Sequence, residues 1–278
     1  MLNDSDSKNT KIRKAFLLIT LCASMFNLVS CQSGSPDYIY THPAALDDGL
    51  AVGTIEEVDI DGSILGKAVD RIRGGKYGEV HSVSIYKDGM LVFEEYFAGH
   101  RYDWASPGFH SDWVAWDSGK RHTVMSVGKS YTSAIVSIAI EEGYIESLQD
   151  AIWDYLPDYQ RFATNGREEI TIQHLVTMTS GLDWVEWGTS YGDDNNYVIK
   201  LWLDCNDQIA CILDLPLVEK PGTHFNYSGG DMILLGEIVR NATGMDIDDF
   251  GAIHLFEPLG INPPEWNRFD SGVVDSSG

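Results

Sequence analysis

The most constraining feature of the sequence is an apolar stretch, residues 134–140, that follows closely on Ser126-Val127-Gly128-Lys129. Together the two segments predict a helix over residues 126–142 that ends at Gly143. A helix that is apolar on nearly all faces must be enclosed by other elements. The chain, with 278 residues and 44% hydrophobic composition, is long enough to build such a core.

Ser126 and Lys129 stand at the head of this helix with the spacing S-x-x-K. Residues three apart on a helix differ by about 300° of rotation, so the two side chains lie on one face. A serine hydroxyl attacks well when a base takes its proton, and a lysine can be that base where burial or a nearby cation lowers its pKa. The alternative is Ser126 as a helix N-cap and Lys129 as a solvated residue. The buried character of the helix favours catalysis, because a lysine at the head of a buried helix needs a partner.

Residues 1–31 resemble a bacterial lipoprotein signal peptide. A basic segment precedes a mostly apolar run, residues 15–26, that is too short to span a membrane. Leu28-Val29-Ser30-Cys31 then resembles a lipobox, so we expect Cys31 to carry the lipid. We expect residues 32–60 to be a tether and residues 61–278 to be the folded domain. An ordinary signal peptide with a chance cysteine is the alternative.

These features predict a protein of the bacterial cell envelope, lipid-anchored and either periplasmic or surface-exposed. In that setting Cys205 and Cys211 would form a disulfide, although six residues apart on one helix they would stay apart as free thiols. A net charge of −23 argues against nucleic acid as a partner. The expected partners are a small-molecule or peptide substrate and, through the lipid, the membrane, and the oligomeric state is left open.

Periodicity predicts the remaining elements. The sequence indicates a helix over residues 64–73 and a hairpin over residues 81–97 that turns at Asp88-Gly89. Residues 100–122 are rich in aromatic side chains but lack a period, so we expect an ordered loop that leads to the serine. Further helices are expected at residues 173–178, 198–203, 209–213, 232–239 and 247–256.

Four segments in this order resemble the serine β-lactamase and penicillin-binding-protein superfamily. They are residues 126–130 (SVGKS), 170–182 (ITIQHLVTMTSGL), 221–228 (PGTHFNYS) and 256–260 (FEPLG). The resemblance spans about residues 60–278 and is strongest to the class C β-lactamase-related group, which includes CubicO-type esterases and D-aminopeptidase-like hydrolases.

The resemblance implies a role for each matching residue. Ser126 would be the nucleophile that forms the acyl-enzyme, Lys129 its activating partner, and Tyr227 the tyrosine of the Y-x-N motif that passes a proton to the leaving group. Gly229 stands where that motif has Asn, which argues against β-lactam hydrolysis. By analogy, Gly229 and the loop residues Trp184, Trp187 and Tyr191 would contact substrate.

The implied fold is α+β, β-lactamase/transpeptidase-like, with an antiparallel sheet flanked by helices and a helical subdomain. The third family motif, K-T-G or H-x-G on a late strand, does not occur before Gly278. We therefore expect the C-terminal strands to be missing, together with one of the two oxyanion donors. The other donor would be the Ser126 N–H.

The expected function is that of a serine hydrolase acting on an ester, an amide or a D-amino-acid peptide without a metal or organic cofactor. A non-catalytic binding or sensor protein with the penicillin-recognition fold, and a β-lactamase, are the alternatives. The acidic pair Asp193 and Asp194 favours a substrate that carries an amine.

Overall fold

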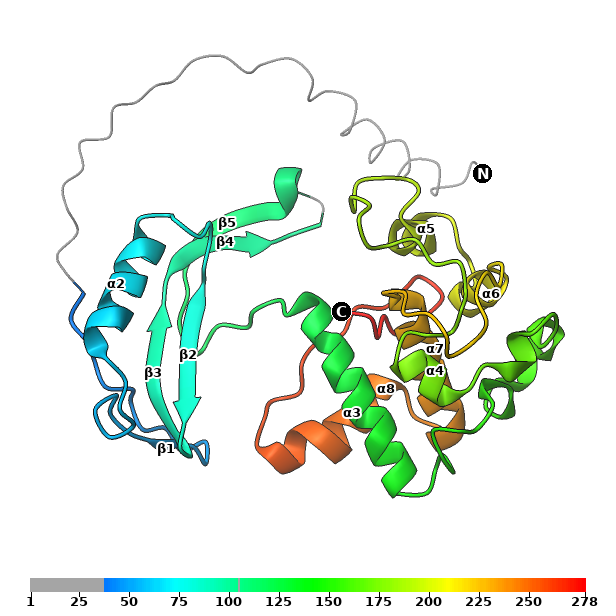
Figure 1. Ribbon diagram of the computed structural model, residues 1–278, viewed down its shortest axis with the longest axis horizontal. Coiled ribbons are helices and arrows are strands. Elements are labelled where there is room, and N and C mark those ends of the chain that lie inside the picture. Colours follow the sequence, from blue (N-terminus) through cyan, green and yellow to red (C-terminus); the bar gives the residue numbers. More distant parts are fainter. Residues whose placement is uncertain (1–37, 105) are drawn as a thin grey trace, which may run out of the picture.

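The computed structural model describes residues 38–104 and 106–278, and places strands and helices in two successive parts (Figure 1). We call residues 38–116 the strand part and residues 125–278 the helical part. The strand part contains β1 (Ala51–Val52), α2 (Gly62–Arg73), β2 (Ser82–Lys87), β3 (Met90–Tyr96), β4 (Ala98–Tyr102) and β5 (His110–Ala115). The helical part contains α3 (Gly128–Glu141), α4 (Ile172–Val176), α5 (Tyr197–Leu203), α6 (Gln208–Leu213), α7 (Gly229–Thr243) and α8 (Ile247–Gly251).

The predicted hairpin and first helix are confirmed. β2 and β3 pair antiparallel and turn at Asp88-Gly89, where Gly89 adopts a φ of 81° that glycine tolerates without strain. Helix α2 begins after Asp61, whose side chain accepts a hydrogen bond from the Ser63 N–H, and ends at Gly74. It lies along the sheet in Figure 1.

The expected tether is wrong from residue 38 onward. β1 pairs parallel with β3, so the sheet has the order β1-β3-β2 and is mixed rather than wholly antiparallel. Ile55 and Val58 are buried beside Val92 and form the small core of the strand part. Residues 38–60 therefore belong to the folded domain, because burying these side chains removes apolar surface from water. The predicted signal peptide, with Cys31, lies outside the described residues.

The aromatic segment 100–122 was expected to be a loop and instead supplies strands. β4 and β5 pair antiparallel in a second, two-stranded sheet, with His100 opposite Trp113 and Tyr102 opposite His110. The segment between the strands contains a 3₁₀ turn, Pro107–Phe109, in place of a tight Asp-Gly turn. Cross-strand aromatic pairing thus stabilises a hairpin that hydrophobic alternation did not indicate.

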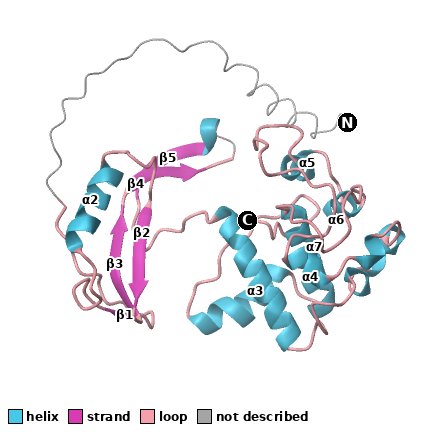
Figure 2. Cartoon of the chain, in the orientation of Figure 1, coloured by secondary structure: helices cyan, strands magenta, loops and turns pink. Residues whose placement is uncertain are grey.

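Most of the core lies in the helical part. α3 packs against α7 and α8, and the fully buried side chains of α7 include Leu234, Leu235 and Ile238. α3 is buried along one side and leaves Ser130 and Ser137 exposed, so it is less enclosed than its composition suggested. Figure 2 shows the same division, with the strands confined to the first part.

The helices around the two cysteines form as predicted. α5 ends before Cys205 and α6 begins after it, and the structure joins Cys205 to Cys211 with their Cα atoms 6.4 Å apart. The break between α5 and α6 turns the chain and brings the two residues together. Within the described part of the chain, no helix has both the length and the apolar character needed to cross a membrane.

Candidate active site

Ser126 lies in the 3₁₀ turn Met125–Val127, immediately before α3. Its side chain is exposed and caps no helix: the N-cap position of α3 is Val127, which makes no side-chain cap bond. The preceding Met125 adopts a φ of 49°, in the left-handed region that a non-glycine residue occupies at a cost of about 1–2 kcal/mol. Strain of this kind is found at functional sites, and here it turns the Ser126 hydroxyl toward a cavity.

Lys129 is buried, with 7% of its surface exposed, and its ammonium group points at the serine. Its Nζ donates a hydrogen bond to Ser126 Oγ at 3.1 Å and another to the carbonyl oxygen of Ser277. The ring of Tyr227 lies below it, with the ring centroid 4.9 Å from Nζ. The structure thus brings Ser126, Lys129 and Tyr227 together, and Tyr227 presents its aromatic face to the cation.

A segment to which the sequence assigned no element, residues 273–278, passes beside this pair. Besides Ser277, it offers the Ser276 carbonyl, which accepts a hydrogen bond from Thr132 Oγ1 at 2.8 Å. A Cβ added at Gly128 would lie 3.3 Å from the Gly278 Cα, so the two backbones approach closely. Glycine at both positions makes this contact possible. Because the contact joins segments that are distant in the sequence, no local pattern predicts it.

Glu186 is a site residue that the sequence reasoning missed. It is 4% exposed and accepts hydrogen bonds from Trp184 Nε1 at 2.8 Å, Tyr191 Oη at 3.0 Å and the Gly229 N–H at 2.8 Å. A Cβ at Gly229 would lie 3.0 Å from Glu186 Oε2. The glycine in the Tyr227-Ser228-Gly229 motif therefore leaves room for this carboxylate. The W-x-E pattern of residues 184–186 was the available signal.

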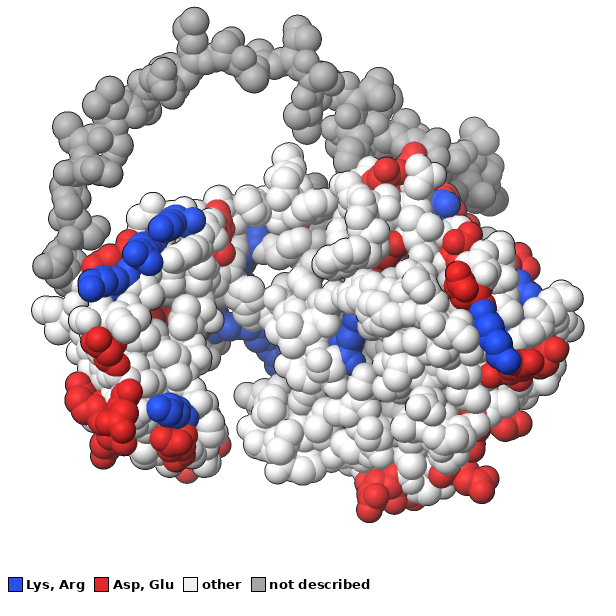
Figure 3. Space-filling model, in the orientation of Figure 1, with Lys and Arg blue, Asp and Glu red and all other residues white. Residues whose placement is uncertain are grey.

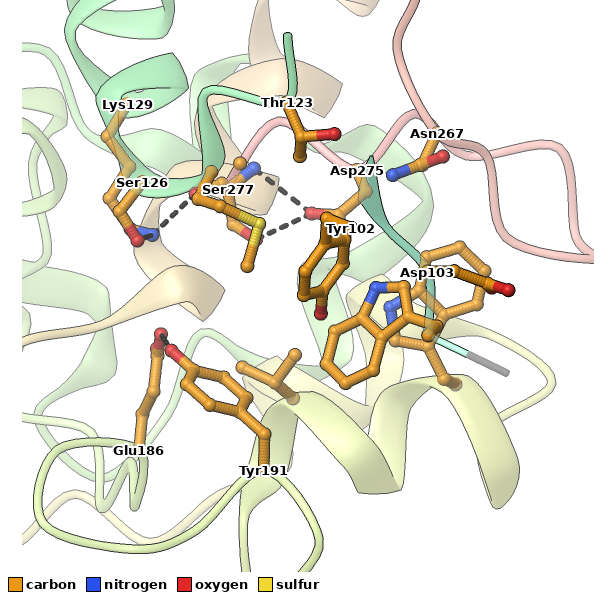
Figure 4. A pocket seen from close by; sticks show the side chains of 15 residues that line it. Tyr102, Asp103, Thr123, Ser126, Lys129, Glu186, Tyr191, Asn267, Asp275 and Ser277 are labelled. Carbon is orange, nitrogen blue, oxygen red and sulfur yellow. Dashed lines mark hydrogen bonds between the residues drawn. The ribbon is translucent and has the colours of Figure 1, made fainter. Parts of the chain in front are cut away.

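A cavity of about 320 Å³ opens over Ser126 and Lys129. Figure 4 shows Ser126, Lys129 and Ser277 on one side and Glu186 with Tyr191 on another. Its lining comes from both parts of the molecule and from the segment between them: Tyr102, Asp103, Trp104, Thr123, Met125, Ser126, Lys129, Glu186, Tyr191, Val198, Trp202, Asn267, Asp275, Ser277 and Gly278. Burial raises the pKa of Asp275, and the nearby Lys129 opposes that shift.

The predicted substrate contacts fall in different places. Tyr191 lines the cavity, and burial followed by the Glu186 charge raises the pKa of its phenol. Trp184 is 4% exposed and stacks on Tyr197 in the core, so it acts by orienting Glu186. Trp187 is 82% exposed and touches the Tyr227 ring at a centroid distance of 5.5 Å, outside the cavity lining. Gly229 is buried behind Glu186.

Comparison with known proteins identifies the family to which the chain belongs. The family model described as Beta-lactamase matches residues 69–274, and the chain therefore belongs to the beta-lactamase family. Over 140 residues it is 27% identical to Protein flp of Staphylococcus aureus (strain MW2), a match that covers 50% of this chain and 26% of that protein. It is 29% identical over 140 residues to penicillin-binding protein 4* of Bacillus subtilis (strain 168), covering 49% of this chain and 28% of that protein.

A solved structure supports the fold. The octameric penicillin-binding protein homologue from Pyrococcus abyssi superimposes with a TM-score of 0.54 and 26% identity, over 72% of this chain and 43% of that one. The matches to Protein flp and to penicillin-binding protein 4* each cover about a quarter of the length of the relative. The α+β, β-lactamase/transpeptidase-like fold predicted from the sequence is confirmed.

Proposed function

We propose that the protein is a serine hydrolase that forms an acyl-enzyme on Ser126. The observation that carries this proposal is the 3.1 Å hydrogen bond between Lys129 Nζ and Ser126 Oγ at the edge of the cavity. The partners of Lys129 Nζ described above are a hydroxyl, a carbonyl and an aromatic face. The neutral amine of a lysine at this distance can accept the proton of the serine hydroxyl.

The reaction uses these side chains in sequence. Ser126 Oγ attacks the substrate carbonyl carbon while its proton moves to the neutral amine of Lys129. The tetrahedral oxyanion is stabilised by the Ser126 N–H. The bond to the leaving group then breaks, and that group departs with a proton from Lys129, with Tyr227 aiding the transfer. Water attacks the acyl-enzyme, releases the acid and restores the Ser126 hydroxyl.

The proposed substrates are esters, amides or D-amino-acid peptides. Gly229 offers no side-chain amide to hold a β-lactam. Glu186 Oε2 lies 3.0 Å from the position that a Cβ at residue 229 would take, so it occupies the space of a larger side chain. Acidic side chains that line the cavity, Glu186, Asp103 and Asp275, favour a substrate with an ammonium group. They replace Asp193 and Asp194 in that argument, since neither of those belongs to the lining.

The nucleophile is tested with p-nitrophenyl esters and intact-protein mass spectrometry. We expect the Ser126→Ala variant to lose at least about 10³-fold in kcat/KM and to acquire no acyl mass. The control is Ser130→Ala, which removes an exposed hydroxyl one turn away. Full activity in the Ser126 variant would overturn the proposal. One acyl group bound without turnover would instead identify the binding or sensor protein.

The substrate preference is tested with two esters of equal size, one carrying a terminal ammonium group and one a neutral group. We expect a lower KM for the cationic ester and loss of that preference in Glu186→Gln, which keeps an acceptor for Trp184 and Gly229. Nitrocefin turnover tests the β-lactamase alternative. Equal KM values for both esters in the wild-type protein would remove the amine from the proposal.

We also propose that Cys31 carries a lipid and holds the protein in the bacterial cell envelope. The support is the residue pattern of the first 31 positions alone. Metabolic labelling with a radioactive fatty acid should mark the wild-type protein and not Cys31→Ser. Figure 3 shows Asp and Glu side chains gathered at several places on one face of the molecule, and the whole chain has a net charge of −23.

A further inference from the structure

A second cluster of reactive side chains lies in the strand part, away from Ser126. It consists of Glu79, which precedes β2, together with His100 on β4 and His110 at the start of β5. One ligand atom from each of the three lies within 4.8 Å of the others. The β4–β5 hairpin brings these two histidines together with a carboxylate that comes from outside the hairpin.

Strand pairing fixes the two histidines side by side. Tyr102 lies opposite His110 and His100 lies opposite Trp113, so the two imidazoles occupy diagonal positions of the hairpin. Their rings stack with centroids 4.6 Å apart and an angle of 2° between the planes. Both are positioned by the backbone, and both are accessible, His110 being exposed and His100 half-buried.

The carboxylate is held against these histidines. Glu79 Oε2 accepts a hydrogen bond from the His100 N–H at 2.8 Å, and Oε1 lies 2.6 Å from His100 Nδ1. Among the ion pairs of the described residues, Glu79 pairs with histidines and with no lysine or arginine. Its charge is therefore available to a cation that the histidines would share.

The absence of a side chain at Gly99 leaves room for the Glu79 carboxylate and the neighbouring His81 ring. A Cβ added at Gly99, on β4, would lie 2.3 Å from His81 Nε2 and 3.1 Å from Glu79 Oε2. Any larger residue there would displace both side chains. His81 Nε2 lies 3.4 Å from Glu79 Oε2 and supports the carboxylate from its other side. His81 Nδ1 lies 2.5 Å from His122 Nε2, which holds the His81 ring in place.

An acidic cluster elsewhere gives a useful contrast. Asp246, Asp248 and Asp249 also lie close together, but Arg268 is bonded to Asp246 at 2.6 Å and to Asp248 at 2.7 Å. That cluster already has its cation. It also has no nitrogen ligand, whereas imidazole is the donor that zinc, copper and nickel prefer.

We propose that Glu79, His100 and His110 bind one divalent transition-metal ion of the zinc class. Two imidazoles and one carboxylate are a known zinc donor set, with a fourth position left to water. Coordination requires ligand distances of about 2.0–2.2 Å, so the exposed side chains must close around the ion from their present separation. The ion would fasten the β4–β5 hairpin, close to its connecting loop, to the segment that precedes β2.

The site has a consequence for the catalytic cavity. Tyr102 at the end of β4 and the following Asp103 and Trp104 line that cavity. An ion held by His100 and His110 would restrict the motion of these residues, because both histidines lie close to the connecting loop. The site is thus a structural one that reaches the substrate pocket through the hairpin, and it supplies no group to the reaction.

The test uses the full-length chain, free of any histidine tag and stripped of metal with a chelator. Calorimetric titration with Zn²⁺ alone should show one ion per chain. His100→Ala/His110→Ala should weaken binding at least about 100-fold, since losing an outer-shell partner alone costs about 10–100-fold. The matched control, His42→Ala/His224→Ala, removes two exposed histidines outside the cluster and should bind as the wild type does.

A second readout keeps the proposal testable if the double variant fails to fold. The Trp113 ring lies 4.8 Å from the His100 ring, so Ni²⁺ should quench wild-type fluorescence and quench Trp113→Phe less. Glu79→Gln, which keeps the shape of the side chain, should weaken Zn²⁺ binding at least about 10-fold. Absence of Zn²⁺ binding by the wild type, or equal affinity in wild type and Glu79→Gln, would overturn the proposal.

Discussion

The strand part and the helical part bury their apolar side chains on very different scales. The buried apolar cluster of the strand part consists of Ile55, Val58 and Val92, and few other apolar side chains of that part are buried. The helical part surrounds α7 with one continuous core that extends along the chain from α3 to Val274. Lys129 sits at the edge of that larger core, whereas the strand part contributes a hairpin tip to the same cavity. The difference indicates that the helical part, which has the larger core, positions the reactive groups. The strand part, which has the smaller core, borders the cavity and shapes access to them.

Exchanging a lysine in each part gives the largest expected contrast. Lys129→Ala should lower kcat/KM by about 10²–10⁴-fold, the usual range for losing a group that transfers protons. Lys87→Ala in the strand part, which removes a hydrogen bond from Nζ to the Val58 carbonyl, should leave kcat/KM within about twofold. Ester hydrolysis measures both. Comparable losses in the two variants would show that catalysis does not reside in the helical part.

A pH titration of stability distinguishes the two environments next. Asp231, on α7, is 1% exposed, and burial raises its pKa from 3.8 to about 7. The folded state then keeps the proton that the unfolded chain loses above pH 3.8. Stability is therefore full below about pH 4 and falls as pH rises toward 7, by up to about 4 kcal/mol. Asp231→Asn should remove this slope in urea unfolding.

Asp61 in the strand part is the control for that titration. It is exposed at the N-terminus of α2, and hydrogen bonds from Ser63 lower its pKa. The contribution of Asp61 to folding stability therefore changes with pH in the opposite direction, and it is lost as the pH falls below about 4. Asp61→Asn should leave the curve between pH 4 and 7 unchanged. Parallel curves for the wild type and Asp231→Asn would contradict the burial argument.

Equal truncations in the two cores measure the packing difference directly. Ile238→Ala and Ile55→Ala remove the same atoms from sites that are 0% and 2% exposed. Such truncations cost about 2–5 kcal/mol, and the cost falls where the surroundings can collapse. We expect Ile238→Ala near the upper limit and Ile55→Ala near the lower one. A larger loss at Ile55 in denaturant unfolding would reverse the comparison.

The smallest expected effect concerns the contact between the two parts. The Trp104 ring meets the Tyr191 ring edge-on, with centroids 6.0 Å apart. Such a pair contributes about 0.5–1.5 kcal/mol, so Trp104→Ala should raise KM by about 2–10-fold with little change in kcat. Trp113→Ala, whose ring is 60% exposed and lies outside the cavity lining, serves as the control. A fall in kcat at constant KM would place Trp104 in the chemistry itself.

The sequence allowed elements with a strong local signal to be predicted. Helix α2, the Asp88-Gly89 hairpin and the helices flanking the cysteines follow from periodicity and turn chemistry. So does the approach of Lys129 to Ser126, since helical rotation alone brings them together. The β4–β5 hairpin was not predicted, because its connection has no Asp-Gly turn and its aromatic side chains do not alternate regularly.

Contacts between distant segments could not be predicted. The Ser277 carbonyl reaches Lys129 across 148 positions of sequence, and the Gly229 N–H reaches Glu186 across 43. Neither acceptor lies in a periodic segment. The expected tether failed for the same reason, because Ile55 and Val58 are buried in a cluster with Val92 on β3 and its neighbours. Local composition shows which residues can be buried but not which partner buries them.

The contact between Glu186 and Gly229 has an evolutionary consequence. Gly229→Asn alone would drive a side chain into Glu186 Oε2, which lies 3.0 Å from the position of its Cβ. Glu186→Ala alone would leave donors on Trp184, Tyr191 and Gly229 without their acceptor. Each single step is therefore disfavoured, while the double replacement removes the contact with Glu186 Oε2 and brings in an amide oxygen as a possible new acceptor. The two positions are epistatic, and a lineage that passes from this motif to Y-x-N must change them in concert.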